Sequence, residues 1–109
     1  MVVEIPFSEK KGSKPRPVIL LEDQSPKFAV CCCTTTDRTG SIAGKLIEKD
    51  SAENEVFFNF EHDTFISYSD IFVIYKEDIM FHIGFCDQKT FDEVMPHFEK
   101  SSFKASQNE

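Results

Sequence analysis

Two stretches of the sequence decide the fold: residues 12–21, GSKPRPVILL, and residues 28–35, FAVCCCTT. Both are rich in residues that suit β-sheets, and a short polar turn at residues 24–27 separates them. The pattern predicts strands over residues 18–21 and 28–36. Because the connection between them is short, we expect the two strands to pair as an antiparallel hairpin.

Arg16 has a well-defined place in this hairpin. Pro15 and Pro17 flank it, and each proline pushes the preceding residue toward extended backbone. Arg16 therefore stands at a stiffened strand entrance, while Thr34 lies near the end of the partner strand. Antiparallel pairing predicts that Arg16 and Thr34 meet at the same edge of the sheet.

Short segments on either side of the hairpin predict a small antiparallel sheet. Further strands are expected at residues 2–5, 45–48, 56–60, 64–68 and 71–75, with loops at residues 8–15 and 37–44. Several short strands separated by turn signals are typical of a partly closed barrel. We therefore expect a mainly β fold of the α+β class.

One helix is expected late in the chain. Asp87 suits an N-cap, and the residues after it place one apolar stripe at i, i+3, i+4 and i+7: Phe91, Val94, Met95 and Phe98. This stripe predicts a helix that packs on the sheet. Pro96 lacks the amide proton for a helical hydrogen bond and predicts a kink or an early end.

Length and composition predict one small domain. The chain has 109 residues, of which 12 are Phe, so a core is possible without metal or disulfides. We expect residues 1–100 to form the domain and residues 101–109 a frayed polar tail. The apolar runs are too short for a membrane helix, and the sequence does not open with a secretory leader pattern. These features favour a cytoplasmic protein without membrane contact.

Charge is divided unevenly along the chain. Residues 1–49 carry eight Lys or Arg and six acids, whereas residues 50–109 carry four Lys and 13 acids, within a net charge of −7. The basic stretch from Lys10 to Arg16 can attract phosphate. Solvated loop lysines are the simpler interpretation of the same residues.

The run Cys31-Cys32-Cys33 does not have metal-ligand spacing, and Cys86 stands apart from it. A strand sends Cys31 and Cys33 to one face and Cys32 to the other. We interpret the cysteines as small buried hydrophobic residues and expect no metal site.

Residues 12–21 and 28–35, followed by residues 71–79, the pair Ile83-Gly84 and the helix from Asp87, resemble the MazF/PemK toxin family in order along the chain. The family shows a lysine- and glycine-containing loop, an Arg-Pro pair before an aliphatic strand, and a second strand that ends in threonine. The resemblance implies a small SH3-like barrel of the CcdB/PemK type with a C-terminal helix.

The resemblance also implies a function. Members of the family are toxin components of type II toxin–antitoxin systems that act as homodimers, cleave single-stranded RNA without metal or cofactor, and are inhibited by a cognate antitoxin. In the family the arginine of the Arg-Pro pair and the strand-terminal threonine are catalytic. Those positions match Arg16 and Thr34, with Thr35 as the alternative register.

Chemistry agrees with these roles. A guanidinium can give two parallel hydrogen bonds to a phosphate, and a threonine hydroxyl adds a neutral donor. Residues expected to bind the RNA backbone come from the basic first half: Lys10, Lys11, Lys14 and Arg38. A surface ion pair for Arg16 and a filler role for Thr34 are the plain alternative.

The sequence leaves the general base open. Some family members have a carboxylate after the Gly-Ser of the first loop, where this chain has Lys14. His62, His82 and His97 are interpreted as structural or surface residues, because no partner for them is identifiable. The second functional hypothesis is a catalytically silent module on the same barrel, which either grips a protein as the gyrase-binding relatives do or is a decayed toxin. A third makes the acidic second half a surface for a basic partner.

Overall fold

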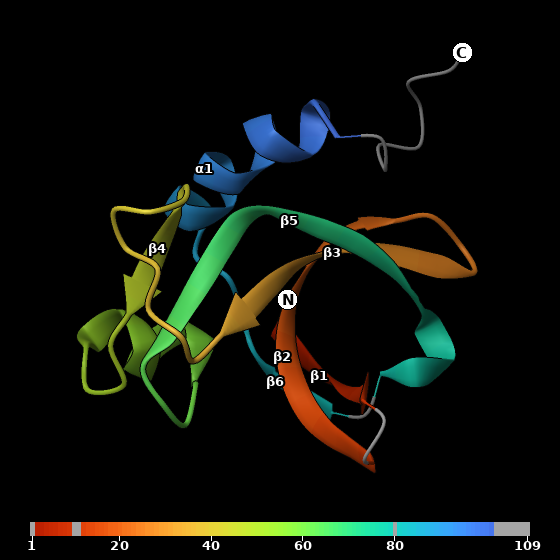
Figure 1. Ribbon diagram of the computed structural model, residues 1–109, viewed down its shortest axis with the longest axis horizontal. Coiled ribbons are helices and arrows are strands. Elements are labelled where there is room, and N and C mark those ends of the chain that lie inside the picture. Colours follow the sequence, from red (N-terminus) through yellow and green to blue (C-terminus); the bar gives the residue numbers. More distant parts are fainter. Residues whose placement is uncertain (1, 10–11, 80, 102–109) are drawn as a thin grey trace.

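An antiparallel sheet makes up most of the computed structural model, which describes residues 2–9, 12–79 and 81–101. The strands in those residues are β1 (Val2–Glu9), β2 (Gly12–Asp23), β3 (Lys27–Thr34), β4 (Gly44–Ile47), β5 (Thr64–Tyr75) and β6 (Phe81–Gly84). They lie in the order β4-β5-β3-β2-β1-β6, and all neighbouring pairs are antiparallel. Figure 1 shows the sheet curling round on itself, so it forms a half-barrel and confirms the mainly β prediction.

The hairpin predicted from residues 12–35 is present as β2 and β3, with Val18 opposite Cys32 and Ile19 opposite Cys31. The prediction of a loop over residues 8–15 is wrong. β1 and β2 pair as far as Glu9 opposite Gly12, so most of that stretch is strand. Glycine and proline in this stretch favour a loop locally. Pairing between β1 and β2 stabilises extended backbone instead, because it supplies backbone hydrogen bonds that an isolated segment lacks.

Two of the expected strands are one strand in the structure. Residues 64–68 and 71–75 both belong to β5. The ladder with β3 shifts its register there, since Cys31 pairs with Ile71 while Cys32 pairs with Ser67. The three residues between those partners bulge out, which explains why the sequence shows an interruption without a turn.

The prediction of a strand over residues 56–60 is wrong. A π-helical turn, η1 (Asn54–Phe58), occupies most of it, and Asn59 ends the turn with a φ of 63°. Phe58 is buried and stacks on Phe60, with ring centroids 5.2 Å apart. Apolar residues at this density fit either a short strand or a buried helical turn, so the pattern alone does not discriminate between them.

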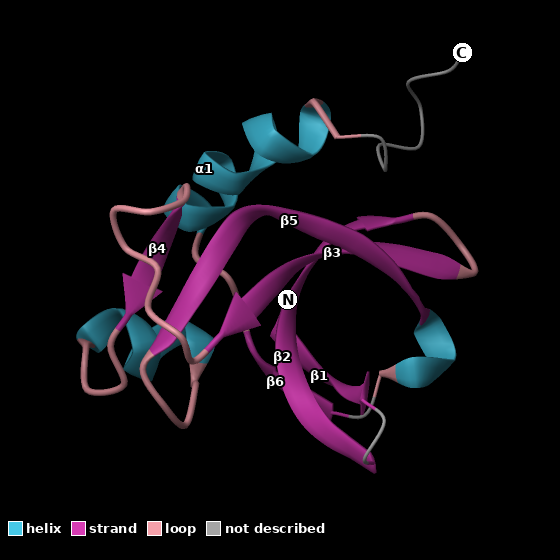
Figure 2. Cartoon of the chain, viewed as in Figure 1, coloured by secondary structure: helices cyan, strands magenta, loops and turns pink. Residues whose placement is uncertain are grey.

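The expected C-terminal helix is α1 (Gln88–Glu99), with Asp87 at its N-cap. Val94 and Phe98 are buried in the core that β5 lines, and Figure 2 shows α1 lying along one side of the sheet. The early end expected at Pro96 is wrong, because the helix continues to Glu99. Pro96 is exposed, so water can bond to the carbonyl that it leaves without a donor.

Two apolar clusters lie on opposite faces of the central strands. The larger includes Ile19, Cys31, Cys33, Val94 and Phe98, and the smaller consists of residues of β2, β3 and β5 with their half-buried neighbours. The burial of Cys31 and Cys33 together, with Cys32 only half-buried, confirms the alternation predicted for the cysteine run.

Within the described part of the chain, a short 3-10 turn, η2 (Lys76–Asp78), leads from β5 toward β6. No helix in these residues is both long and apolar enough to cross a membrane. The polar tail expected over residues 101–109 lies outside the described residues except for Ser101, whose hydroxyl donates to the Phe98 carbonyl at 2.8 Å.

Candidate functional site

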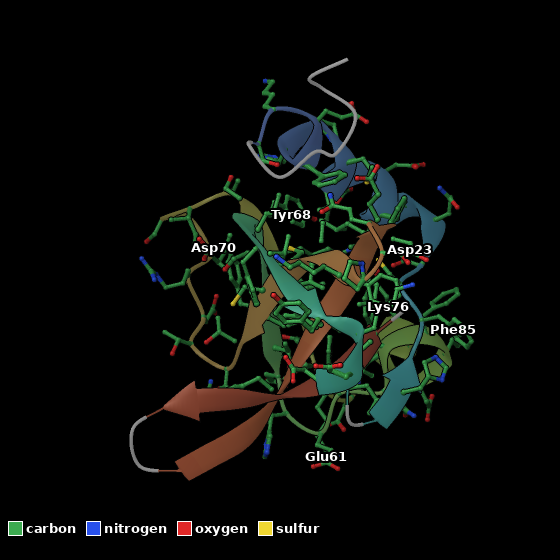
Figure 3. All side chains as sticks on the ribbon, turned by 90° about the vertical axis from the view of Figure 1, so that its right-hand side faces the viewer. Asp23, Glu61, Tyr68, Asp70, Lys76 and Phe85 are labelled. Carbon is green, nitrogen blue, oxygen red and sulfur yellow. The ribbon has the colours of Figure 1, made fainter. Side chains whose placement is uncertain are left out.

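A pocket of about 1040 Å³ lies where β2, the end of β3, the turn before β5 and β6 come together. Its lining is polar on several sides and draws on distant parts of the sequence: Arg16, Pro17, Cys33, Thr34, Thr35, residues 59–64, His82 and Ile83. Figure 3 shows Glu61, one of the lining residues, at the end of the molecule opposite α1.

The sheet register brings Arg16 and Thr34 to this pocket. The recorded β2–β3 ladder ends with Val18 opposite Cys32, and the same register extended by two residues sets Arg16 opposite Thr34. Thr34 is held from its other side, where it pairs with Phe65 of β5. Arg16 and Thr34 thus line one pocket at a single edge of the sheet, as the hairpin predicted.

Both candidate threonines are present in the lining. The Thr34 side chain is half-buried, and its hydroxyl oxygen accepts the backbone N–H of Thr36 at 3.2 Å. A hydroxyl that accepts in this way keeps its own proton to donate. Thr35 is exposed beside it. The structure therefore places hydroxyl donors near Arg16 in either register.

The charge of Arg16 acts on the neighbouring strand. Burial raises the pKa of the Cys32 thiol, the Asp70 carboxylate raises it further, and the Arg16 guanidinium opposes both. A positive charge favours a thiolate only at short range. Arg16 is half-buried at the start of this part of β2.

A buried asparagine shapes the opposite wall of the pocket. The side-chain amide of Asn54 donates to the carbonyls of Lys49 and Phe60 at 2.9 and 3.0 Å, and its carbonyl accepts the N–H of Phe60 at 2.8 Å. Asn59 then donates to the carbonyl of Ile83 in β6 at 3.2 Å. These bonds tie Phe60 to Asn54 and Asn59 to β6.

Two histidines line the pocket on this wall. His62 lies in the turn, where its carbonyl accepts the hydroxyl of Thr64 at 2.8 Å. His82 lies on β6, and its ring meets the edge of Phe85 with centroids 5.0 Å apart. Both side chains are exposed. The third histidine, His97, lies elsewhere, on α1 beside Ser69 and Tyr68.

Of the four residues expected to bind the RNA backbone, Arg38 is not among the described lining residues of the pocket. Lys10 and Lys11 lie outside the described residues. Lys14 is in β2, paired with Phe7 of β1 and two residues before Arg16. Arg38 is exposed in the loop after β3, where its carbonyl accepts the N–H of Ser41.

The pocket carries charges of both signs. Among its described lining residues Arg16 is the permanent cation, and Glu61 and Asp63 are acids. The Asp63 carboxylate accepts the backbone N–H of Lys49 at 2.8 Å. Burial raises the pKa of the Cys33 thiol well above its usual value, so this lining residue is neutral. In residues 2–9, 12–79 and 81–101 no group of three or more histidine, cysteine or acidic side chains is arranged to hold a metal ion.

Sequence reasoning missed the histidines in this pocket. The turn at residues 61–63 was expected, and His82 was expected in a sheet segment before Ile83 and Gly84. Nothing local to either residue shows that β6 and the turn pack together. That contact depends on η1, which the sequence pattern did not predict.

No protein-family model matches the sequence, and no curated protein shows a significant match to it. Solved structures do match. The Mycobacterium tuberculosis toxin MazF-mt6 aligns with a TM-score of 0.64 at 18% identity, over 89% of this chain and 91% of that one. An Mtb toxin aligns with a TM-score of 0.60 at 17% identity, over 88% of this chain and 96% of that one. The chain therefore has the fold of the MazF toxins, as the resemblance in its sequence predicted.

Proposed function

We propose that the chain is the toxin of a type II toxin–antitoxin pair and an endoribonuclease that cleaves single-stranded RNA without a metal ion. The observation that carries this proposal is the joint presence of Arg16, Thr34 and Thr35 in one pocket on a MazF-like fold. A homodimer, an antitoxin partner and a cytoplasmic location belong to the same proposal.

The proposed reaction uses the RNA's own nucleophile. The 2′-hydroxyl oxygen attacks the adjacent phosphorus as it loses its proton, and the bond from phosphorus to the 5′-oxygen breaks as that oxygen gains a proton. The products are a 2′,3′-cyclic phosphate and a 5′-hydroxyl. Negative charge accumulates on the phosphate oxygens in the transition state, which is where fixed donors lower the barrier.

Arg16 and the threonines suit that transition state. The Arg16 guanidinium is always protonated and can bond two phosphate oxygens at once. The Thr34 hydroxyl, with its oxygen already bonded to the Thr36 amide, has its proton available for a phosphate or ribose oxygen. Thr35 offers the same group one residue on. The pocket volume of about 1040 Å³ has room for a nucleotide and its neighbours.

Cleavage of a mixed-sequence single-stranded RNA in EDTA tests the proposal. We expect cyclic-phosphate and 5′-hydroxyl ends, and a loss of about 100- to 1000-fold in kcat for Arg16→Ala, the usual cost of one preorganised donor. Arg16→Lys should recover little of this, because lysine cannot bond both oxygens. Lys89→Ala, on an exposed position of α1, is the control that should cleave normally.

The threonine variants decide the register. If Thr34 takes part in catalysis, Thr34→Val should lose activity; if Thr35 does, Thr35→Val should lose it. The serine variant of the same residue should stay active because it keeps the hydroxyl. A wild-type protein that leaves a broad RNA panel uncut would contradict the proposal. Tight binding of a protein by that inert chain would support the silent-module hypothesis instead.

A further inference from the structure

The proposed cleavage needs two proton transfers that Arg16 and the threonines do not provide. One group must take the proton of the 2′-hydroxyl, and another must give a proton to the 5′-oxygen. Arginine stays protonated at any working pH, and a threonine hydroxyl is a weak base. The inference drawn here rests on the proposed function and concerns which residues move these protons.

Three of the other ionisable groups in the pocket lining are poorly suited. The Cys33 thiol is buried and protonated, since burial holds its pKa well above the usual value. The Asp63 carboxylate is already engaged by the Lys49 amide. Glu61 is exposed at the end of the molecule, where solvent competes for its carboxylate.

We propose that His62 and His82 are the acid and the base of this reaction. Histidine is the side chain that ordinarily exists in both protonation states near neutral pH, so one neutral ring and one protonated ring can act together. The neutral ring takes the proton from the 2′-oxygen while the protonated ring gives one to the 5′-oxygen. The two rings exchange states, and solvent restores them after product leaves.

The backbone that carries the two rings is fixed from both sides. The His62 carbonyl is bonded by Thr64, and the His82 ring lies against Phe85. Asn59 bonds Ile83, which ties the turn of His62 to the strand of His82. Two side chains that are separated by twenty residues in the sequence therefore line the same pocket as Arg16 and Thr34.

The pocket lining holds charged residues of both signs beside the two histidines. Glu61 and Asp63 flank His62 in the turn, and Arg16 lies across the pocket on β2. On β1, Val3 is the residue that pairs with His82. The neighbouring β3 contributes Cys33, which is neutral.

A pH profile with matched histidine variants tests the inference. We expect kcat/KM of the wild type to follow a bell-shaped curve with pH. His62→Ala and His82→Ala should each lower it by about 100- to 10,000-fold and each remove one limb of the curve. His97→Ala, a histidine on α1 outside the pocket, should keep both the rate and the curve. Glutamine variants and thermal unfolding confirm that the fold is retained.

A modified substrate separates the acid from the base. RNA with sulfur in place of the bridging 5′-oxygen has a leaving group that needs no proton. The variant that lacks the acid should therefore cleave it nearly as fast as the wild type, while the variant that lacks the base should stay slow. Rescue of one histidine variant and not the other supports the inference.

The outcomes distinguish this inference from the function on which it rests. If both histidine variants cleave RNA at the wild-type rate and with the wild-type pH profile, the inference alone is overturned. A loss of cleavage in Glu61→Gln but in neither histidine variant would also overturn it. Absence of wild-type cleavage would overturn the proposed function and the inference together.

Discussion

The cysteines of β3 show how burial controls the chemistry of a residue. Cys31 and Cys33 are buried in the larger core, and the Cys31 thiol donates to the carbonyl of Ser67 at 3.0 Å. Burial is the main cause that raises the pKa of each thiol in the run, and burial raises the pKa of Cys86 to about 12. A thiol that cannot ionise is neither a nucleophile nor a metal ligand.

Alkylation of the native protein should therefore be slow. At about pH 8 the thiolate fraction of Cys86 is roughly a thousandfold lower than that of an ordinary thiol. The thiolate that remains is more nucleophilic, so the alkylation rate is lower by about 30-fold. The native rate should keep rising with pH toward about 12, whereas the rate in urea should level off above 9.0. Iodoacetamide labelling followed by peptide mass spectrometry measures both rates.

Cys33 makes the same experiment informative for the pocket. It is fully buried and should react more slowly than the half-buried Cys32. Rapid native labelling of Cys33 would show a thiolate in the pocket lining. That result would contradict the neutral role given to this residue beside Arg16.

Individual site residues differed in how far the sequence could place them. Arg16 and Thr34 were predictable because both belong to one hairpin, whose register follows from two adjacent strands. His62 and His82 were not predictable as neighbours. Their meeting depends on a bond from Asn59 to Ile83 and on the packing of η1 under β6, which are contacts between segments far apart in the chain.

At the scale of elements, β6 and η1 touch through their backbones. The N–H of Phe85 donates to the carbonyl of Phe57 at 2.8 Å. A Cβ atom added to Gly84 would lie 2.3 Å from the carbonyl oxygen of Phe58 and 2.5 Å from that of Phe57. Glycine is therefore required at residue 84 by close backbone approach, which gives the Ile83-Gly84 pair a physical reason.

Gly84→Ala should loosen this contact. Backbone atoms cannot give way as a flexible side chain does, so we expect a loss of about 1–3 kcal/mol in the free energy of unfolding. Cleavage activity should fall as well, because His82 lies two residues before the contact. Urea denaturation measures the first effect and RNA cleavage the second.

Gly40→Ala is the matched control for this substitution. Gly40 has a φ of 86°, but its Cβ position has nothing within 4 Å. Its cost should come from backbone conformation alone, about 1 kcal/mol, with activity retained. An equal loss of stability in the two variants would show that the close approach at Gly84 is not a constraint.

The elements that the sequence mispredicted share one cause. Residues 8–15 became strand because β1 and β2 pair with each other, and residues 54–58 became a π-helical turn because Asn54 finds its bonds within the loop. Both outcomes depend on partners outside the local window. By contrast, the apolar stripe of α1 carries its own periodicity, and the helix was predicted within one residue of its start.

At the scale of the whole molecule, the division of charge bears on how RNA would be bound. The net charge of −7 repels a polyanion at long range, so binding must rely on local contacts. The hairpin of β1 and β2 extends from Arg16 toward Gly12 and carries Lys14 along the way. An RNA strand that left the pocket along this hairpin would run beside the basic first half of the chain.

The salt dependence of RNA binding tests whether that basic half contacts phosphates. Each phosphate contact on single-stranded nucleic acid adds about −0.7 to the slope of log affinity against log salt. Contacts from Arg16 together with Lys10, Lys11, Lys14 and Arg38 would weaken binding about 100-fold between about 50 and 200 mM salt. Replacing those four residues with glutamine should reduce the change to about 3-fold, with kcat of bound RNA unchanged. Fluorescence anisotropy with a non-cleavable 2′-deoxy oligonucleotide measures the affinity at each salt concentration. Equal slopes for the two proteins would show that the four residues do not contact the phosphates.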